Sequence, residues 1–168
     1  RYSIYMDTIV IDGKTFEAFT TSGGLGTMCE TFENKLDTLN YKTIRYPGHA
    51  KLMKFLLYEL ILKNNKSLLE NILTEAKPPV QEDIVYVYAV IEGWKKNTLK
   101  REEYYKAFTP ITIDGQHWRA ISWTTAASLC AVIELVAKKK LPQKGFIKQE
   151  EINFRDLLST SYGKYFKN

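Results

Sequence analysis

Residues 2–21 read YSIYMDTIVIDGKTFEAFTT, two runs that alternate apolar and polar residues on either side of Asp12-Gly13. Alternation with a period of two is typical of a β-strand that is buried on one face. Asp-Gly favours a type I′ turn, because both central residues of that turn need a positive φ. The stretch therefore predicts a β-hairpin and antiparallel strand pairing.

The same arrangement recurs later in the chain, where residues 104–113 and 116–121 flank Asp114-Gly115. Between the two hairpins, residues 84–91 are apolar at both odd and even positions. Such a strand belongs in the interior of a sheet, covered on both faces, or covered on one face and pressed against another subunit on the other. Residues 94–97 predict the turn into a long strand that begins at about Lys100.

Helical patterns lie between these strands, over residues 50–63, 67–76 and 124–140, with one more short helix within 152–166. The first is expected to be mostly buried on a sheet, and Ser67 is the expected N-cap of the second. The third carries one charge, Glu134, before its lysine run, so we expect it in the centre of the core. The predicted fold class is α+β: a mixed, largely antiparallel sheet of about six strands with packed helices.

Composition narrows the class of protein. The chain has 168 residues and 24 Lys plus Arg against 19 Asp plus Glu, a net charge of +5, which fits one globular domain over residues 1–168. Basic residues alternate with acidic ones, so we expect no nucleic-acid partner. The apolar run 55–62 is far shorter than the ~20 residues of a membrane span, so we expect no membrane partner. Two widely separated cysteines favour a reducing, cytoplasmic location with neither disulfide nor zinc.

The first candidate site is the segment TTSGGLGT, residues 20–27, at the end of the hairpin. Exposed N–H groups at the start of a helix attract anions, and glycine lets a ligand approach the backbone, so Thr21, Ser22, Gly23 and Gly24 are candidates for an anion cradle. The alternative is that Ser22 merely caps a helix that starts at about Leu25. Residues 24–29 begin like a dinucleotide fingerprint, but they lack its last glycine and the acidic residue further on, which excludes a nicotinamide site here.

The second candidate site is the end of a strand, NYKTIRYPGH over residues 40–49. Arg45 offers a guanidinium that grips a carboxylate with two hydrogen bonds, and Tyr46 and His49 add a phenol and an imidazole. The alternative is that Arg45 pairs with a surface acid, Tyr46 packs and His49 is solvated. Residues 122–128, SWTTAAS, favour close packing of a helix, and no Ser-His-Asp or Cys-His spacing identifies a catalytic residue.

Four strings, taken in order and with their spacing, resemble the C-terminal half of the saccharopine dehydrogenase family. They are FTTSGGLGT at 19–27, LNYKTIRYPGH at 39–49, TTAAS at 124–128 and LPQKGFIKQE at 141–150. The resemblance covers about residues 5–165. It implies a domain similar to the C-terminal domain of glyceraldehyde-3-phosphate dehydrogenase, which follows a separate Rossmann domain that binds NAD or NADP.

The resemblance also implies a function. Family members pass a hydride between the nicotinamide and the carbon of a C–N bond in an amino-acid-derived substrate, such as saccharopine, lysine or carboxynorspermidine. By this resemblance the chain binds an amino-acid-like substrate and forms a homodimer. Arg45 is expected to hold a substrate carboxylate, with Thr21, Ser22 and the amides of Gly23 and Gly24 assisting, and with Tyr46 and His49 lining the site.

Two further expectations follow. The chain begins at Arg1 without Met, so we expect a piece of a longer protein that by itself neither binds NAD(P)H nor turns over substrate. The alternative class is a non-catalytic assembly or dimerisation module, which the two-sided apolar strand at 84–91 also fits.

Overall fold

The computed structural model describes residues 6–21 and 24–167, and the chain divides into two compact units, Arg1–Pro79 and Val80–Asn168. The expected α+β class with antiparallel pairing is confirmed. The expected single sheet of about six strands is wrong, because the described strands form three separate sheets of three, two and two strands. The assignment of residues 1–168 to one family domain stays a prediction.

The first unit is built on the predicted hairpin. Strands β1 (Met6–Ile11) and β2 (Lys14–Phe19) pair antiparallel, and β3 (Thr43–Arg45) joins the other edge of β2. The turn residues Asp12 and Gly13 have φ of +51° and +71°, as a type I′ turn requires. Ile11, Phe16 and Ala18 are buried against this sheet.

The helices of the first unit are short. They are α1 (Met28–Thr31), α2 (His49–Lys54), a π-helical stretch η1 (Phe55–Glu59), a 3₁₀ turn η2 (Leu62–Asn64) and α3 (Lys66–Ala76). The helix predicted over 50–63 thus changes its winding and ends at Ile61, whose φ is +56°, and Leu52 and Tyr58 on it are exposed, so the expectation that it is mostly buried is wrong. The N-cap of α3 is Asn65, whose side chain accepts the N–H of Leu68, and not Ser67.

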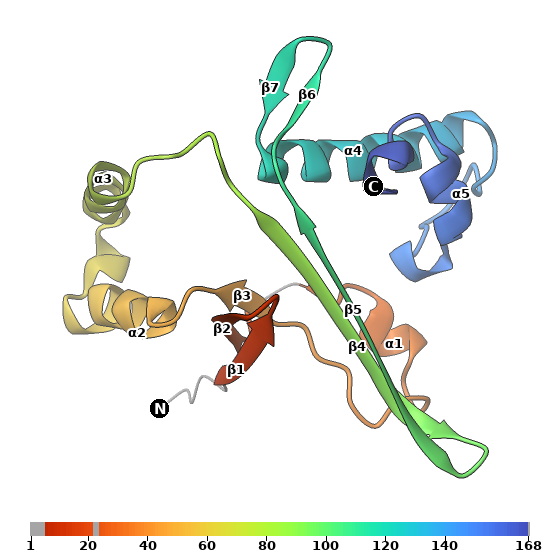
Figure 1. The fold of residues 1–168 in the computed structure, drawn as a ribbon, viewed down its shortest axis with the longest axis horizontal. Coiled ribbons are helices and arrows are strands. Elements are labelled where there is room, and N and C mark those ends of the chain that lie inside the picture. Colours follow the sequence, from red (N-terminus) through yellow and green to blue (C-terminus); the bar gives the residue numbers. More distant parts are fainter. Residues whose placement is uncertain (1–5, 22–23, 168) are drawn as a thin grey trace. The chain divides into compact units, whose positions relative to one another are not determined.

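The second unit carries a long two-stranded ribbon of β4 (Val85–Lys95) and β5 (Thr98–Phe108), drawn in green in Figure 1. Its turn residues Lys96 and Asn97 have φ of +51° and +58°, so the turn predicted at 94–97 is confirmed. The expected place of strand 84–91 inside a sheet is wrong: β4 pairs only with β5 among the described strands, and 76% of the surface of Ile91 is exposed.

The hairpin at Asp114-Gly115 is present but short, with β6 (Ile111–Ile113) and β7 (Gln116–Trp118). The sequence predicts one strand over 104–113, whereas the structure breaks it between β5 and β6 at Thr109 and Pro110. Proline has no N–H to give to a strand ladder, which accounts for the break.

Helix α4 (Ala120–Ala137) buries one stripe of residues spaced three or four apart, namely Ala120, Trp123, Ala127, Ala131 and Leu135. Trp123 packs edge-on against Phe108 at 5.4 Å between ring centroids, and it also contacts Phe166. The remaining elements are η3 (Gln149–Glu151), α5 (Phe154–Ser159) and η4 (Gly163–Phe166), which confirm a short helix within 152–166.

Two features of α4 were not predicted from the sequence: the residue at which it begins, and a length and apolar character that would let it cross a membrane. The carboxylate of Asp83 accepts the N–H groups of Ala120 and Ile121 at 2.6 and 2.9 Å, so the helix begins four residues before the expected Thr124. The sequence reasoning also overlooked that α4 is long and apolar enough to cross a membrane. A core helix passes the same test, but α4 buries one stripe only: 28% of it is buried, and Ile121, Leu129 and Ile133 are exposed. The expectation that this helix lies in the centre of the core is therefore wrong for its exposed side, and the absence of a membrane partner stays a prediction.

Candidate functional site

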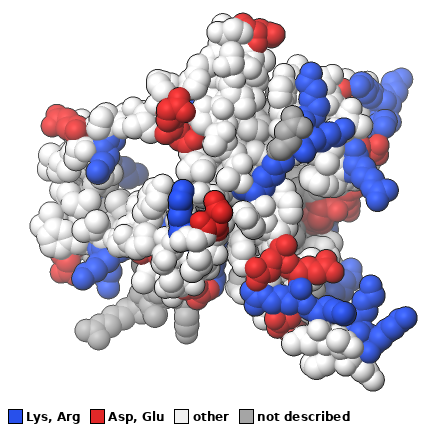
Figure 2. All heavy atoms as spheres, viewed as in Figure 1, with Lys and Arg blue, Asp and Glu red and all other residues white. Residues whose placement is uncertain are grey.

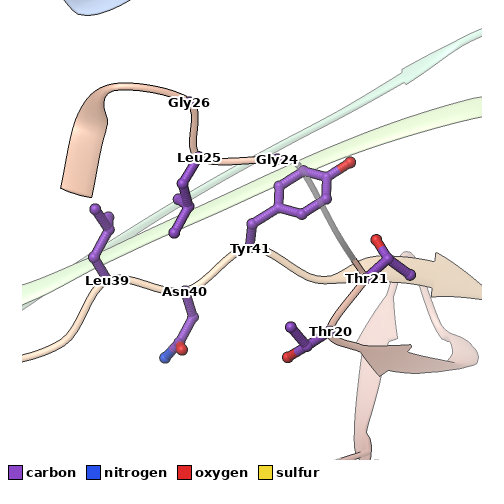
Figure 3. Close-up of a pocket in the computed structure, with 8 residues that line it drawn as sticks. All are labelled: Thr20, Thr21, Gly24, Leu25, Gly26, Leu39, Asn40 and Tyr41. Atoms are coloured by element: carbon purple, nitrogen blue, oxygen red, sulfur yellow. The ribbon is translucent and has the colours of Figure 1, made fainter. Parts of the chain in front are cut away.

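A pocket of about 330 Å³ opens in the first unit, where two segments that are distant in sequence meet. Figure 3 shows the segment that follows β2 on one side and the segment that leads to β3 on the other. The lining residues are Thr20, Thr21, Gly24, Leu25, Gly26, Leu39, Asn40 and Tyr41. The pocket therefore unites parts of the two strings that the sequence singled out separately.

Gly24 and Tyr41 form the closest approach in this pocket. The ring of Tyr41 lies against the backbone of Gly24, so that a Cβ added at Gly24 would overlap the ring (Figure 3). The glycine is needed here because an aromatic ring occupies the place of a side chain.

A hydroxyl pair ties the pocket to the sheet. Thr21 Oγ1 lies 2.7 Å from Thr43 Oγ1, the first residue of β3. The bond joins the chain after β2 to the strand on which Arg45 lies.

The pairing of β2 with β3 decides which side chains share a face. Phe19 lies opposite Thr43, and Glu17 lies opposite Arg45. Residues directly opposite in an antiparallel pair, and residues two apart in one strand, point to the same side. Arg45 therefore shares a face with Thr43, and its exposed guanidinium donates from Nη1 to the Ile44 carbonyl at 2.8 Å.

His49 joins this face and Tyr46 does not. The imidazole of His49 stacks on Phe19, with ring centroids 6.2 Å apart and planes 15° apart. Tyr46 contacts Phe16 at 5.7 Å, and Phe16 points to the opposite face of β2. The structure thus places Arg45 and His49 on one face of the sheet and Tyr46 on the other, and none of the three lines the pocket that holds Thr21 and Gly24.

Glu17 is the buried charge of this region, with 6% of its surface exposed. Its two carboxylate oxygens accept the backbone N–H groups of Gly48 at 2.8 Å and Ala50 at 2.5 Å. Sequence reasoning missed this residue, because alternation within a hairpin marks Glu17 as a surface position.

The remaining candidates stand as follows. Ser22 and Gly23 lie outside the described residues. The helix expected from about Leu25 is α1, which begins at Met28 and has four residues, so it offers little helix dipole to an anion. The pocket is also lined by Leu25, Leu39, Asn40 and Tyr41, which the sequence does not single out. In the string at 39–49 the groups that point to chemistry are those near its end, Arg45, Tyr46 and His49.

The described residues offer no group of three or more His, Cys, Asp or Glu side chains that could hold a metal ion. No model of a known protein family matches the chain, and no solved structure matches its fold. The resemblance to the saccharopine dehydrogenase family therefore rests on the four quoted strings.

Proposed function

We propose that the chain is the substrate-binding and dimerisation part of a saccharopine dehydrogenase-like, NAD(P)-dependent oxidoreductase that acts on the C–N bond of an amino-acid-derived substrate. One observation carries the proposal: two strings of the family resemblance, one after β2 and one leading into β3, meet in the 330 Å³ pocket and through the Thr21–Thr43 hydroxyl pair.

The chemistry of the face fits a zwitterionic substrate. Arg45 is exposed and its guanidinium donates to the neighbouring carbonyl of Ile44, an intramolecular contact that a substrate carboxylate replaces with two charged hydrogen bonds. The hydroxyl of Thr21 and the amide of Gly24 lie in the adjoining pocket and orient the rest of the molecule. Holding both ends of the substrate removes orientational freedom before the reaction.

The hydride chemistry belongs to NAD or NADP, which a separate domain would bind. The part played by the residues of this chain is to fix the substrate carbon in one pose. A lysine or carboxynorspermidine dehydrogenase would use the same arrangement with a different amine.

Arg45→Ala in an enzyme that contains this chain tests the proposal. We expect the KM for saccharopine to rise and kcat/KM to fall by about 10- to 100-fold, the value of a charged hydrogen-bonded contact. Arg155→Ala, in the exposed start of α5, is the matched control and should leave both constants unchanged. Equal KM and kcat/KM values for the Arg45 and Arg155 variants would contradict the proposal that Arg45 binds a substrate carboxylate.

A second candidate function, an assembly module, is favoured by the surface of the ribbon. Side chains of both its strands are large, apolar and exposed, namely Val87, Val90, Ile91, Trp94, Leu99, Tyr104 and Tyr105. Because successive residues of a strand point to opposite faces, these side chains divide between the two faces of the ribbon. Each face exposes on the order of 400 Å² of them, about half of the roughly 800 Å² that one partner contributes to a standard interface.

The ribbon also carries its own charge pairs. Arg101 is bonded to Glu103 on the same strand, and Glu92 lies opposite it in the register. The hydrogen bond from Arg101 to Glu103 raises the pKa of the guanidinium. Figure 2 shows blue and red side chains next to one another along this part of the molecule. Because these charges are already compensated, the apolar side chains are what a second copy of the chain would cover.

A further inference from the structure

We propose that Glu17 is a positioning residue for the candidate site: its buried carboxylate holds the turn from Gly48 to Ala50 and thereby sets His49 on Phe19, on the face of the sheet that also carries Arg45. The inference deepens the proposed function and rests on it for the identity of the ligand. The bonds of Glu17 to the turn are independent of that identity.

The first step is the environment of the carboxylate. Glu17 is buried, whereas Arg45, its opposite residue in β3, is exposed and directs its guanidinium to a backbone carbonyl. The hydrogen bonds to Glu17 come from the two amides of Gly48 and Ala50. A buried carboxylate is costly unless such bonds satisfy it, so the strand position and the turn are held to each other.

The second step is what the turn lacks. Helix α2 begins at His49, and its N-cap residue Gly48, with φ of +93°, has no side chain to accept the free N–H groups of the first turn. Ser, Thr, Asp or Asn supplies that acceptor in most helices. Here Glu17 supplies it from a residue 31 positions earlier in the chain.

The third step is the effect on His49, which lies between the two bonded amides. Its ring stacks on Phe19, two residues after Glu17 on the same strand and face. Alternate positions of one stretch thus carry three functions: Glu17 holds the turn, Phe19 supports the imidazole, and Thr21 bonds to Thr43. A shift of the turn moves His49 relative to Arg45 without changing either residue.

The test compares Glu17→Gln with Glu33→Gln, an exposed glutamate of the same unit, in the 168-residue protein. A glutamine in the same place has one acceptor oxygen and presents an NH₂ group to the other amide. We expect hydrogen exchange at the amides of Gly48 and Ala50 to accelerate by on the order of tenfold. The NMR cross-peak between the His49 and Phe19 rings should weaken, and the affinity for added saccharopine should fall several-fold.

The Glu33 variant should show none of these changes. If Glu17→Gln does not fold, Gly48→Ala strains the same turn without touching the carboxylate, because a Cβ there meets no atom within 4 Å but φ stays positive. It should weaken the same cross-peak and the same affinity.

Unchanged exchange and an unchanged cross-peak in Glu17→Gln would overturn the proposal, and so would loss of the cross-peak with full affinity for saccharopine. If the wild-type protein shows no response to saccharopine while Glu17→Gln still releases the turn, the proposed function fails and the hold of Glu17 on the turn stands.

Discussion

A side chain at residue 24 has no room, since the Tyr41 ring fills its place. Gly24→Ala should therefore push the ring aside, at about 1–3 kcal/mol of stability, as overpacking of a filled site does. Gly93→Ala is the matched control, because a Cβ at Gly93 meets nothing within 4 Å. Chemical denaturation of both variants measures the difference.

A double mutant makes the Gly24 prediction specific. Tyr41→Ala removes the obstacle, so the further loss caused by Gly24→Ala should shrink in that background. If the loss is equally large without the ring, the contact between residues 24 and 41 is not what the glycine serves.

Glu134, on α4, is a carboxylate whose titration the structure changes. The hydrogen bond from Lys138 Nζ, at 2.5 Å, lowers the pKa of Glu134 below its ordinary value of 4.5, and the amide of Ser161 adds to this at 2.8 Å. A carboxyl group with a lowered folded pKa stabilises the folded protein above its unfolded pKa, and the contribution is lost as the pH falls through the folded value. Acid should therefore loosen the Ser161 contact.

Carboxyl NMR titration checks the Glu134 prediction. The midpoint should lie below 4.5 in the wild type and should rise in Lys138→Ala. A midpoint at or above 4.5 in the wild type, or one that Lys138→Ala leaves in place, would contradict it.

Single residues also show the limits of sequence reasoning at the site. Thr21, Arg45 and His49 stand out in the sequence because a hydroxyl, a guanidinium and an imidazole follow the ends of two predicted strands. Glu17 and Tyr41 do not, because a turn 31 residues later buries the first, and the second is placed by its contact with Gly24, which lies 17 residues earlier. Both residues make their contacts with residues that are distant in sequence, and such contacts cannot be read from local periodicity.

At the scale of elements, α4 depends on a cap from another segment. Asp83→Ala removes acceptors for the N–H groups of Ala120 and Ile121, so we expect a loss of about 1–2 kcal/mol in thermal unfolding, the usual value of a helix cap. Glu82→Ala, the neighbouring and more exposed acid, should cost less. Equal losses would mean that Asp83 does not cap the helix.

Elements defined by short-range chemistry are the ones that the sequence predicts well. All three two-residue turns, at 12–13, 96–97 and 114–115, are found where expected, because turn geometry depends on the turn residues themselves. Helix ends and sheet size are predicted poorly. The start of α4 depends on Asp83, and the number of strands in a sheet depends on which hairpins meet.

At the scale of the whole molecule, the ribbon predicts a dimer. Wild-type protein should sediment at the mass of two chains, whereas Ile91→Lys combined with Trp94→Lys, at positions 76% and 75% exposed, should sediment at the mass of one. A lysine at either position would lose its hydration in the dimer interface, which costs free energy. In the monomer the same lysine stays hydrated, so the substitutions favour the monomer.

Leu129→Lys, at an exposed apolar position of α4, is the matched control and should remain dimeric. If Leu129→Lys alone dissociates the dimer, the interface lies on α4 and not on the ribbon. A monomeric wild type would contradict the assembly role of the ribbon.

The tip of that ribbon has a kinetic consequence. The turns at 12–13 and 114–115 place a glycine at their second position, whereas Lys96 and Asn97 adopt left-handed conformations with side chains attached. Each such residue carries an energetic penalty that glycine avoids. A hairpin zips from its turn within microseconds once the turn has closed. The two longest described strands of the second unit therefore start from a less favourable nucleus, and they stay unpaired, and open to aggregation, longer than the strands of a hairpin of equal length with a glycine turn would.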